Sequence, residues 1–578
     1  MYTIKSLCVT FIDFGHLFIE MELAQLNASA KNKMMSGKYP AAIADFTKVI
    51  EGTKATTEDK TALKISAYNN RSYCNILTKK YDEALDDVNN AIELANSARK
   101  PEAIKALDVE QRKNDEIITL LVEALARRAN IYDMKDKCLE SLQEYQNAMN
   151  IIPDGEAKVA YNRLLKTCGI HQLPEDQRLG IFSDVVSHIL DRPSLIESMK
   201  KLCDYFTSPQ EISKPDLEFF ASSKAINVPD GVITFYVRDP EVVLLSIKTI
   251  SAIGKKGCLP VYSFFNDVKD CIKNYPKNIE IVTEAVQYLF DTPEQAFIKF
   301  ADEESIEPIC DCFSLGLPES VKEQLFFILF NIANNEELCL KVLNHPPVLD
   351  NIINEKSVGA GMLMSRLTQS TPFAKFAIGK CGFAWIAKLL NPDLGVEKVT
   401  GLVIALSRCV MICKDVENFD YKKEVTIVVE NVVPTLQKMM KSLDICSNGF
   451  ACLALSVDIV PERIQQLRAV RLASLGLALH KQQPKVVQNV MAFVYYAAKS
   501  GLLQDVKEIE NAIVPVIFDA IRESSSYQPI CEHAIAILVM LDHPSKQKML
   551  LAGIQQYPNS QILKDLIPGN IDLKQIPH

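Results

Sequence analysis

The sequence is poor in glycine and proline, with 21 and 27 in 578 residues, and has no Ser/Gly-rich or Pro-rich linker. This scarcity argues against small domains on flexible tethers and favours one continuous architecture. Basic residues are also in the minority: 63 lysines and arginines face 72 acidic residues, for a formal net charge of -9, and no long basic run occurs. A general phosphate-binding surface is therefore not expected, and nucleic acid is excluded as a partner.

Long apolar runs are missing too. No segment reaches the roughly 18 uninterrupted apolar residues that a membrane span needs, so no membrane partner is expected. The apolar start "MYTIKSLCVTFIDFGHLFIE" is interrupted by Asp13 and lacks a small-residue cleavage site, which argues against a signal peptide. We expect residues 1–20 to be a dispensable N-terminal extension before a natural start at Met21. The 16 cysteines, irregularly spaced from Cys8 to Cys531, are typical of reduced thiols in a cytoplasmic protein.

Signatures of catalysis and metal binding are also lacking. Cys310 and Cys312, and likewise Cys409 and Cys413, have no second Cys/His pair at the spacing of a zinc site, so buried thiols are expected. His533 lies within the apolar stretch "CEHAIAILVML", where a hydrogen-bonded core histidine is expected. We therefore predict a protein that is not an enzyme and has no cofactor or metal.

What the sequence does contain is helical periodicity. Three segments share one pattern: "GKYPAAIADFTKVI" (37–50), "KKYDEALDDVNNAI" (79–92) and "DKCLESLQEYQNAM" (136–149). Each has a small residue (Ala42, Ala84, Ser141) followed four residues later by a larger one (Phe46, Val88, Tyr145), so that both lie on one helical stripe. A second amphipathic helix precedes each segment. Extra length relative to a standard repeat falls at 51–60 and at 96–117. The second, highly charged insert is expected to lengthen helices, and a capping helix is expected after Pro153.

The rest of the chain has a longer helical period. Apolar helices alternate with short breaks from about Leu179 onward, and the β-branched stretch "VITFYV" (232–237) is expected to be a buried helix end. The inner helices are anchored at Ile250, Leu289, Ile332, Leu367, Leu406, Leu455, Tyr496 and Leu541, in steps of 35 to 49 residues. These steps centre on the roughly 40 to 47 residues of armadillo or HEAT units. A generic all-helical domain without true repeats is the alternative.

The three helix pairs resemble tetratricopeptide repeats, and the later helices resemble armadillo repeats. The fold class expected from this resemblance is all-α, with a tetratricopeptide helix-pair array at 21–170 and an armadillo/HEAT-like α-solenoid at 171–578. This order resembles that of UCS-type co-chaperones, which hold a heat-shock chaperone with the front module and a myosin motor with the armadillo groove. It also resembles the cytoplasmic tetratricopeptide-armadillo factor that assembles ciliary dynein arms.

Some tetratricopeptide domains hold the C-terminal tail of heat-shock chaperones in a carboxylate clamp of cations and asparagines. By resemblance, its positions fall on Asn27, Lys31, Asn70 and Arg127. The first two stand in inverted order, and Glu123 occupies the position of a clamp lysine. Glu123 would repel a peptide carboxylate unless a cation such as Arg128 offsets it. The alternative is that Asn70 and Arg127 only satisfy neighbouring polar groups.

The resemblance implies a non-enzymatic co-chaperone or assembly adaptor. The front module would recruit the C-terminal tail of a heat-shock chaperone, and the solenoid groove would hold a protein client such as myosin or dynein. Asn331, in "LFFILFNIANNEELC", falls where armadillo repeats often place a groove-facing asparagine. The competing hypothesis is a structural scaffold that joins protein partners without a chaperone.

Overall fold

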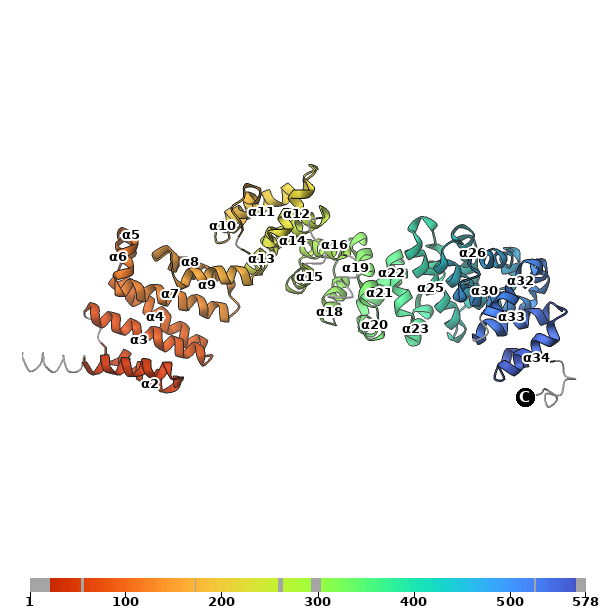
Figure 1. Cartoon of the computed structure of the whole chain (residues 1–578), viewed down its shortest axis with the longest axis horizontal. Coiled ribbons are helices and arrows are strands. Elements are labelled where there is room, and N and C mark those ends of the chain that lie inside the picture. The colour runs from red at the N-terminus through yellow and green to blue at the C-terminus, as the bar shows by residue number, and fades with distance from the viewer. Residues whose placement is uncertain are drawn as a thin grey trace, which may run out of the picture. The chain divides into compact units, whose positions relative to one another are not determined.

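The computed structural model describes residues 21–53, 57–171, 173–257, 264–292, 303–523 and 527–567. Over these residues the chain is helical and has no β-strand, which confirms the all-α prediction (Figure 1). The expected N-terminal extension, residues 1–20, lies outside the described residues. The chain divides into two compact units, residues 1–267 and 268–578, and the division falls within α15 (Phe265–Asn274).

The first unit begins with three antiparallel helix pairs. Its helices are one over residues 21–35, α2 (Tyr39–Gly52), α3 (Glu58–Leu77), α4 (Tyr81–Ala98), α5 (Pro101–Ala106), α6 (Val109–Asn114), α7 (Glu116–Met134), α8 (Cys138–Ile151), α9 (Glu156–Thr167), α10 (Gly180–Ser187), α11 (Arg192–Thr207), α12 (Lys214–Ser222), α13 (Val228–Phe235) and α14 (Pro240–Lys255).

The same turn joins the two helices of each pair. Gly37, Lys79 and Asp136 occupy equivalent positions, and all three have positive φ, at 73°, 60° and 54°. This left-handed residue ends the first helix and reverses the chain. The small residues of the second helices, Ala42, Ala84 and Ser141, are fully buried, as the sequence pattern predicts. The helix-pair repeat is therefore present in both its turn and its packing.

The longer insert, residues 96–117, is helical, but only in part by lengthening a helix. The part of the insert that follows α4 forms two short helices, α5 and α6. Arg112 stabilises their arrangement, because its guanidinium donates to the carbonyl oxygens of Ile104 (3.0 Å), Leu107 (2.9 Å) and Ile151 (3.1 Å). These bonds fold the insert back onto the end of α8. The sequence prediction was right about helix and wrong about its continuity.

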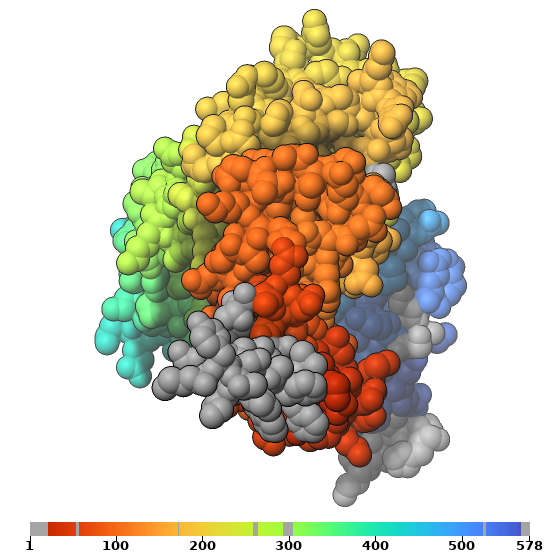
Figure 2. Space-filling model, turned by 90° about the vertical axis from the view of Figure 1, so that its left-hand side faces the viewer, coloured from red at the N-terminus to blue at the C-terminus, as the bar shows by residue number. Residues whose placement is uncertain are grey.

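The core does not stop after the third pair. α9 packs on α8, as expected of a capping helix, but one hydrophobic cluster continues from Ala62 to Ile253. In Figure 2 the orange third pair accordingly adjoins the yellow helices that follow it. Of the stretch 232–237, the first four residues form the end of α13, where Val232, Ile233 and Phe235 are buried, as predicted; Tyr236 and Val237 follow the helix. The domain boundary at residue 170 stays a prediction.

The second unit is a run of stacked helices. They are α16 (Ile279–Phe290), α18 (Glu303–Asp311), α19 (Glu319–Ile332), α20 (Glu336–Leu343), α21 (Pro346–Glu355), α22 (Val358–Leu367), α23 (Thr371–Cys381), α24 (Ala384–Lys388), α25 (Val396–Ile412), α26 (Tyr421–Met439), α27 (Leu443–Ser456), α28 (Pro461–Gln466), α29 (Arg471–His480), α30 (Pro484–Ala497), α31 (Leu503–Glu508), α32 (Glu510–Glu523), α33 (Gln528–Met540), α34 (Lys546–Gln556) and α35 (Gln561–Lys564).

Seven of these helices form the inner row that the sequence predicts. In chain order α16, α19, α22, α25, α27, α30 and α33 each pack on the next, with the intervening helices outside this row. Most of the anchor residues are buried, but Tyr496 is 37% exposed and its neighbour Tyr495 is only 3% exposed. The anchor of α30 was therefore placed one residue too far along. The stacking of each inner helix on the next is that of a helical solenoid.

Candidate functional site

The positions predicted to form a clamp lie on the first helices of the three pairs. Asn70 is on α3, which packs directly on α7. Its amide Nδ2 donates to the Ser66 carbonyl at 2.8 Å, one turn back in the same helix, and the residue is 8% exposed. The same nitrogen also lies 3.4 Å from Ser66 Oγ, so the amide donors of Asn70 are directed at its own helix.

Arg127, on α7, is also engaged. Its guanidinium donates to the Glu123 carboxylate one turn earlier and to the Asn69 carbonyl of α3, and it stacks 5.2 Å from the centroid of the Tyr73 ring. Glu123 therefore sits beside Arg127 and neutralises it. A peptide carboxylate would have to displace this partner before it could bind the arginine.

Arg128 has a different orientation from its neighbour. Its guanidinium donates to Asn89 Oδ1 at 3.1 Å and to Glu144 Oε2 at 2.7 Å, so it ties α7 to α4 and α8. The sequence analysis named Arg128 as a cation that could offset the negative charge of Glu123. In the structure Arg127, not Arg128, forms the ion pair with Glu123.

The remaining clamp positions lie on the helix over residues 21–35. Asn27 is 6% exposed, and its Oδ1 is buried without a hydrogen-bond partner. Lys31 is exposed, and among the described residues it makes no ion pair. Of the predicted set, Lys31 is thus the cation available to a ligand, while Asn70, Arg127 and Arg128 have partners inside the module.

The two polar residues on either side of Asn70, Asn69 and Arg71, are engaged with other helices of the module. Asn69 is fully buried and donates to the Leu120 carbonyl of α7 at 3.0 Å. Arg71 forms a bidentate pair with Asp87 of α4, at 2.6 and 3.0 Å, and donates to Thr47 of α2 at 2.9 Å. Both side chains join helices of the module. Helical periodicity alone did not reveal them, because their partners lie on other helices.

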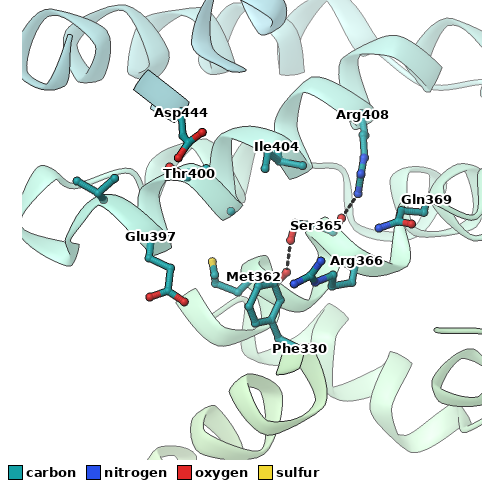
Figure 3. Close-up of a pocket in the computed structure, with 12 residues that line it drawn as sticks. Phe330, Met362, Ser365, Arg366, Gln369, Glu397, Thr400, Ile404, Arg408 and Asp444 are labelled. Carbon is teal, nitrogen blue, oxygen red and sulfur yellow. Dashed lines mark hydrogen bonds between the residues drawn. The ribbon is translucent and has the colours of Figure 1, made fainter. Parts of the chain in front are cut away.

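In the second unit, a cavity of about 500 Å³ opens between α19, α22, α25 and the start of α27 (Figure 3). Its lining residues are Phe330, Met362, Ser365, Arg366, Gln369, Val396, Glu397, Thr400, Gly401, Ile404, Arg408 and Asp444. These come from successive helices of the inner row. The cavity is therefore built by the repeat stacking itself, not by a loop.

Two arginines dominate one side of this cavity. Arg408 donates to the Ser365 carbonyl, the residue before Arg366, and the Arg366 guanidinium stacks 4.6 Å from the centroid of the Phe330 ring. Arg366 Nε is buried without a hydrogen-bond partner. Burial and the nearby Arg366 lower the pKa of Arg408.

A second cavity of about 250 Å³ adjoins the first, because both are lined by Phe330, Met362 and Glu397. Asn331 lines it, together with Phe290, Phe327, Ile328 and Lys398. The Lys398 ammonium lies 4.9 Å from the centroid of the Phe327 ring. The asparagine singled out in the sequence thus lies in a groove of mixed aromatic and cationic character.

The thiols and histidines point to packing. Cys310 and Cys312 are buried, and burial raises the pKa of Cys312 to about 12. Among the described residues no cluster of three or more His, Cys, Asp or Glu side chains is arranged to hold a metal. His533 is buried with Nδ1 2.8 Å from the Pro529 carbonyl, which confirms a core histidine. None of the described helices is both long and apolar enough to cross a membrane.

No family model and no curated protein matches this sequence. Among solved structures, a chain from a study of the phosphorylation switch between cadherin and β-catenin matches with a TM-score of 0.47 and 9% identity, over 90% of this chain and 96% of that one.

Two further solved structures match less closely. The C. elegans myosin chaperone UNC-45 in complex with an Hsp90 peptide matches with a TM-score of 0.21 and 11% identity, over 93% of this chain and 73% of that one. Yeast Tom70 matches with a TM-score of 0.23 and 12% identity, over 86% of this chain and 98% of that one. Since all three TM-scores lie below 0.5, function has to be argued from this chain's own side chains.

Proposed function

We propose that this protein is a non-enzymatic co-chaperone or assembly adaptor of the cytoplasm. In this proposal the front module recruits the C-terminal tail of a heat-shock chaperone. The solenoid groove holds a protein client, such as a motor protein of the myosin or dynein class. The observation that carries the proposal is the pair of adjoining cavities along the inner helices. These cavities offer aromatic side chains together with cationic side chains that no described carboxylate pairs with.

The client half is supported by the composition of the groove. Aromatic side chains and arginine are enriched at the centres of protein interfaces, where they combine apolar area with directed polar contacts. Phe290 is 39% exposed at the end of α16, and Phe327 and Phe330 follow on α19. A client segment laid across α16, α19 and α22 would bury these rings.

The chaperone half is supported by the placement of Asn70 and Arg127 on the packed helices α3 and α7, with Lys31 exposed on the first helix. Its obstacle is Glu123, which already holds Arg127. Tail binding would exchange one carboxylate for another at this arginine. Its affinity therefore depends on how readily Glu123 is displaced.

Calorimetry on the full chain with a Met-Glu-Glu-Val-Asp peptide tests the chaperone half. We expect Glu123→Gln to tighten binding about three- to tenfold, because it removes an internal competitor of like charge. Arg127→Ala should abolish binding. Glu140→Gln makes the same substitution at an exposed site on α8 and should leave the affinity unchanged. No heat at millimolar peptide with both the wild type and Glu123→Gln would refute chaperone-tail binding.

The second candidate is a structural scaffold that joins protein partners without a chaperone. The Glu123–Arg127 pair favours it, because the pair leaves that arginine satisfied without a ligand. This candidate predicts that affinity capture with the full chain recovers stable complexes free of heat-shock proteins. Recovery of a heat-shock chaperone that is lost with Arg127→Ala would refute it.

A further inference from the structure

The two arginines of the larger cavity have no acidic partner. Two other half-buried arginines, Arg71 and Arg128, pair with Asp87 and Glu144, and a third, Arg112, is satisfied by backbone carbonyls. Arg366 and Arg408 make no ion pair with any described residue. Their polar contacts are with a backbone carbonyl and the face of a ring.

This arrangement is costly for the protein alone. Two guanidinium groups close together repel one another, and partial burial removes the water that would screen them. The buried, unpartnered Nε of Arg366 adds the cost of an unmade hydrogen bond. An anion between the two groups would relieve all three costs, since a guanidinium binds an oxyanion through several N–H donors at once.

The acidic residues of the same cavity do not fill this role. Glu397 and Asp444 are exposed and lie on the opposite side of the cavity from Arg408 (Figure 3). Neither forms an ion pair with the arginines. The cavity thus has a cationic side and an acidic side, with the apolar Met362 and Ile404 also in its lining.

We propose that this cavity is a subsite for a single carboxylate, the side chain of an aspartate or glutamate in an acidic segment of the client protein. Arg366 and Arg408 would hold the carboxylate. The Phe330 ring fixes the plane of Arg366, so less side-chain freedom is lost on binding. The subsite rests on the client half of the proposed function and supplies its chemistry: recognition of acidic residues flanked by apolar ones.

A single carboxylate fits better than a phosphorylated side chain. A phosphate group carries close to two negative charges at neutral pH. Glu397 and Asp444 face the same cavity and would repel that second charge. Apolar lining next to the arginines also suits a neighbouring leucine or phenylalanine of the client.

The test uses a library of random ten-residue peptides displayed on phage, selected separately on the full-length wild type and on the Arg366→Gln/Arg408→Gln double variant. We expect a set of peptides that only the wild type enriches and that share one aspartate or glutamate. Peptides that bind the front module should be enriched by both proteins. Far-UV circular dichroism and the thermal unfolding midpoint check that the variant folds.

One synthetic peptide of the wild-type-specific set is then measured by fluorescence anisotropy in a double-mutant cycle. Replacing its acidic residue with the amide should weaken binding to the wild type about tenfold, but to Arg366→Gln by less than about twofold. Arg366→Lys should keep part of the affinity. Lys380→Gln removes one positive charge from α23, outside the inner row, and should change binding by less than about twofold.

Three outcomes would overturn the subsite. The double variant enriches the same peptides as the wild type; the wild-type-specific peptides share no acidic residue; or phosphoserine at the key position binds more tightly than glutamate. In the first case, peptides would still bind the groove of the double variant. That result would refute the carboxylate subsite but not the proposal that the groove holds a client. Binding of the chaperone-tail peptide is independent of all three.

Discussion

Replacing Arg71 with alanine is the sharpest test of how the front module is held together. Arg71 donates to both oxygens of Asp87, and Asn75 donates to the same carboxylate at 3.2 Å. Asp87 is 2% exposed. Without Arg71 this carboxylate would keep one amide donor, and Thr47 of α2 would lose its bond to α3.

The expected cost is about 3 kcal/mol. Removing one partner of a buried ion pair typically costs about 3–5 kcal/mol, and the 20% exposure of the Arg71 side chain lets some water reach the site, which places the value at the lower end. Replacing Asp87 as well should restore part of the stability, because the unpaired buried charge is then gone. The Arg71→Ala/Asp87→Ala variant should therefore be no less stable than Arg71→Ala.

The pH dependence follows from the Asp87 carboxyl. Burial raises the pKa of Asp87 in the native protein, although the Arg71 guanidinium counteracts it. Without Arg71 the native pKa rises further above that of the unfolded chain. A raised native pKa costs stability as pH increases, so the penalty of Arg71→Ala should shrink when Asp87 is protonated in acid.

Amide hydrogen exchange on peptides from α3 and α4, at about pH 5 and pH 7, measures this local free energy. Peptides from α27 and α30, in the other compact unit, serve as the internal control. A loss below about 1 kcal/mol, or the same loss at both pH values, would contradict the assignment of Arg71 as the neutralising partner of Asp87.

Two further predictions concern other buried groups. Burial and the nearby Asp267 carboxyl raise the pKa of Asp230 to about 8, so the native state loses stability as pH rises from the unfolded value of 3.8 through about 8. At about 1.4 kcal/mol per pKa unit, Asp230→Asn should gain about 5 kcal/mol at pH 8 and less than about 1 kcal/mol at pH 4, measured by urea denaturation. A Cβ on Gly359 of α22 would come within 2.8 Å of the Glu323 carbonyl, whereas one on Gly379 of α23 would meet nothing closer than 3.6 Å. Gly359→Ala should therefore lower the free energy of unfolding by about 1–3 kcal/mol, and Gly379→Ala should raise it by up to about 1 kcal/mol. The fluorescence of the sole tryptophan, which lies in the second unit, measures the unfolding of both variants.

The helix-pair array was predictable because its signal is local. A small residue and an apolar one four positions later lie on the same helix, so Ala42 and Phe46 report their shared stripe without knowledge of any other element. The break of the charged insert into α5 and α6 was not predictable in this way. It depends on Arg112 reaching Ile151, a partner 39 residues away that no periodicity marks.

The same distinction explains the misplaced anchor on α30. Tyr495 and Tyr496 are adjacent, and either one satisfies an apolar pattern read with an uncertain phase. Only packing against α27 and α33 decides that Tyr495 is buried. Similarly, the sequence pointed to Asn331 through its helix, but it gave no reason to single out Arg366 and Arg408, which lie 42 residues apart and meet only because α22 and α25 stack.

The contrast between Arg127 and Arg366 shows what a binding-site prediction requires beyond residue type and spacing. Both arginines lie on helices of a repeat array, and each stacks on an aromatic ring of the preceding repeat, Tyr73 or Phe330. Arg127 has Glu123 one turn before it and is neutralised within its own helix. Arg366 has Met362 at that position, so no residue one turn earlier in its own helix neutralises its charge. In our proposal, the residue four positions earlier decides whether an arginine in a groove serves structure or binding. Exchanging the two residue types, glutamate and methionine, between positions 123 and 362 should therefore exchange the two behaviours.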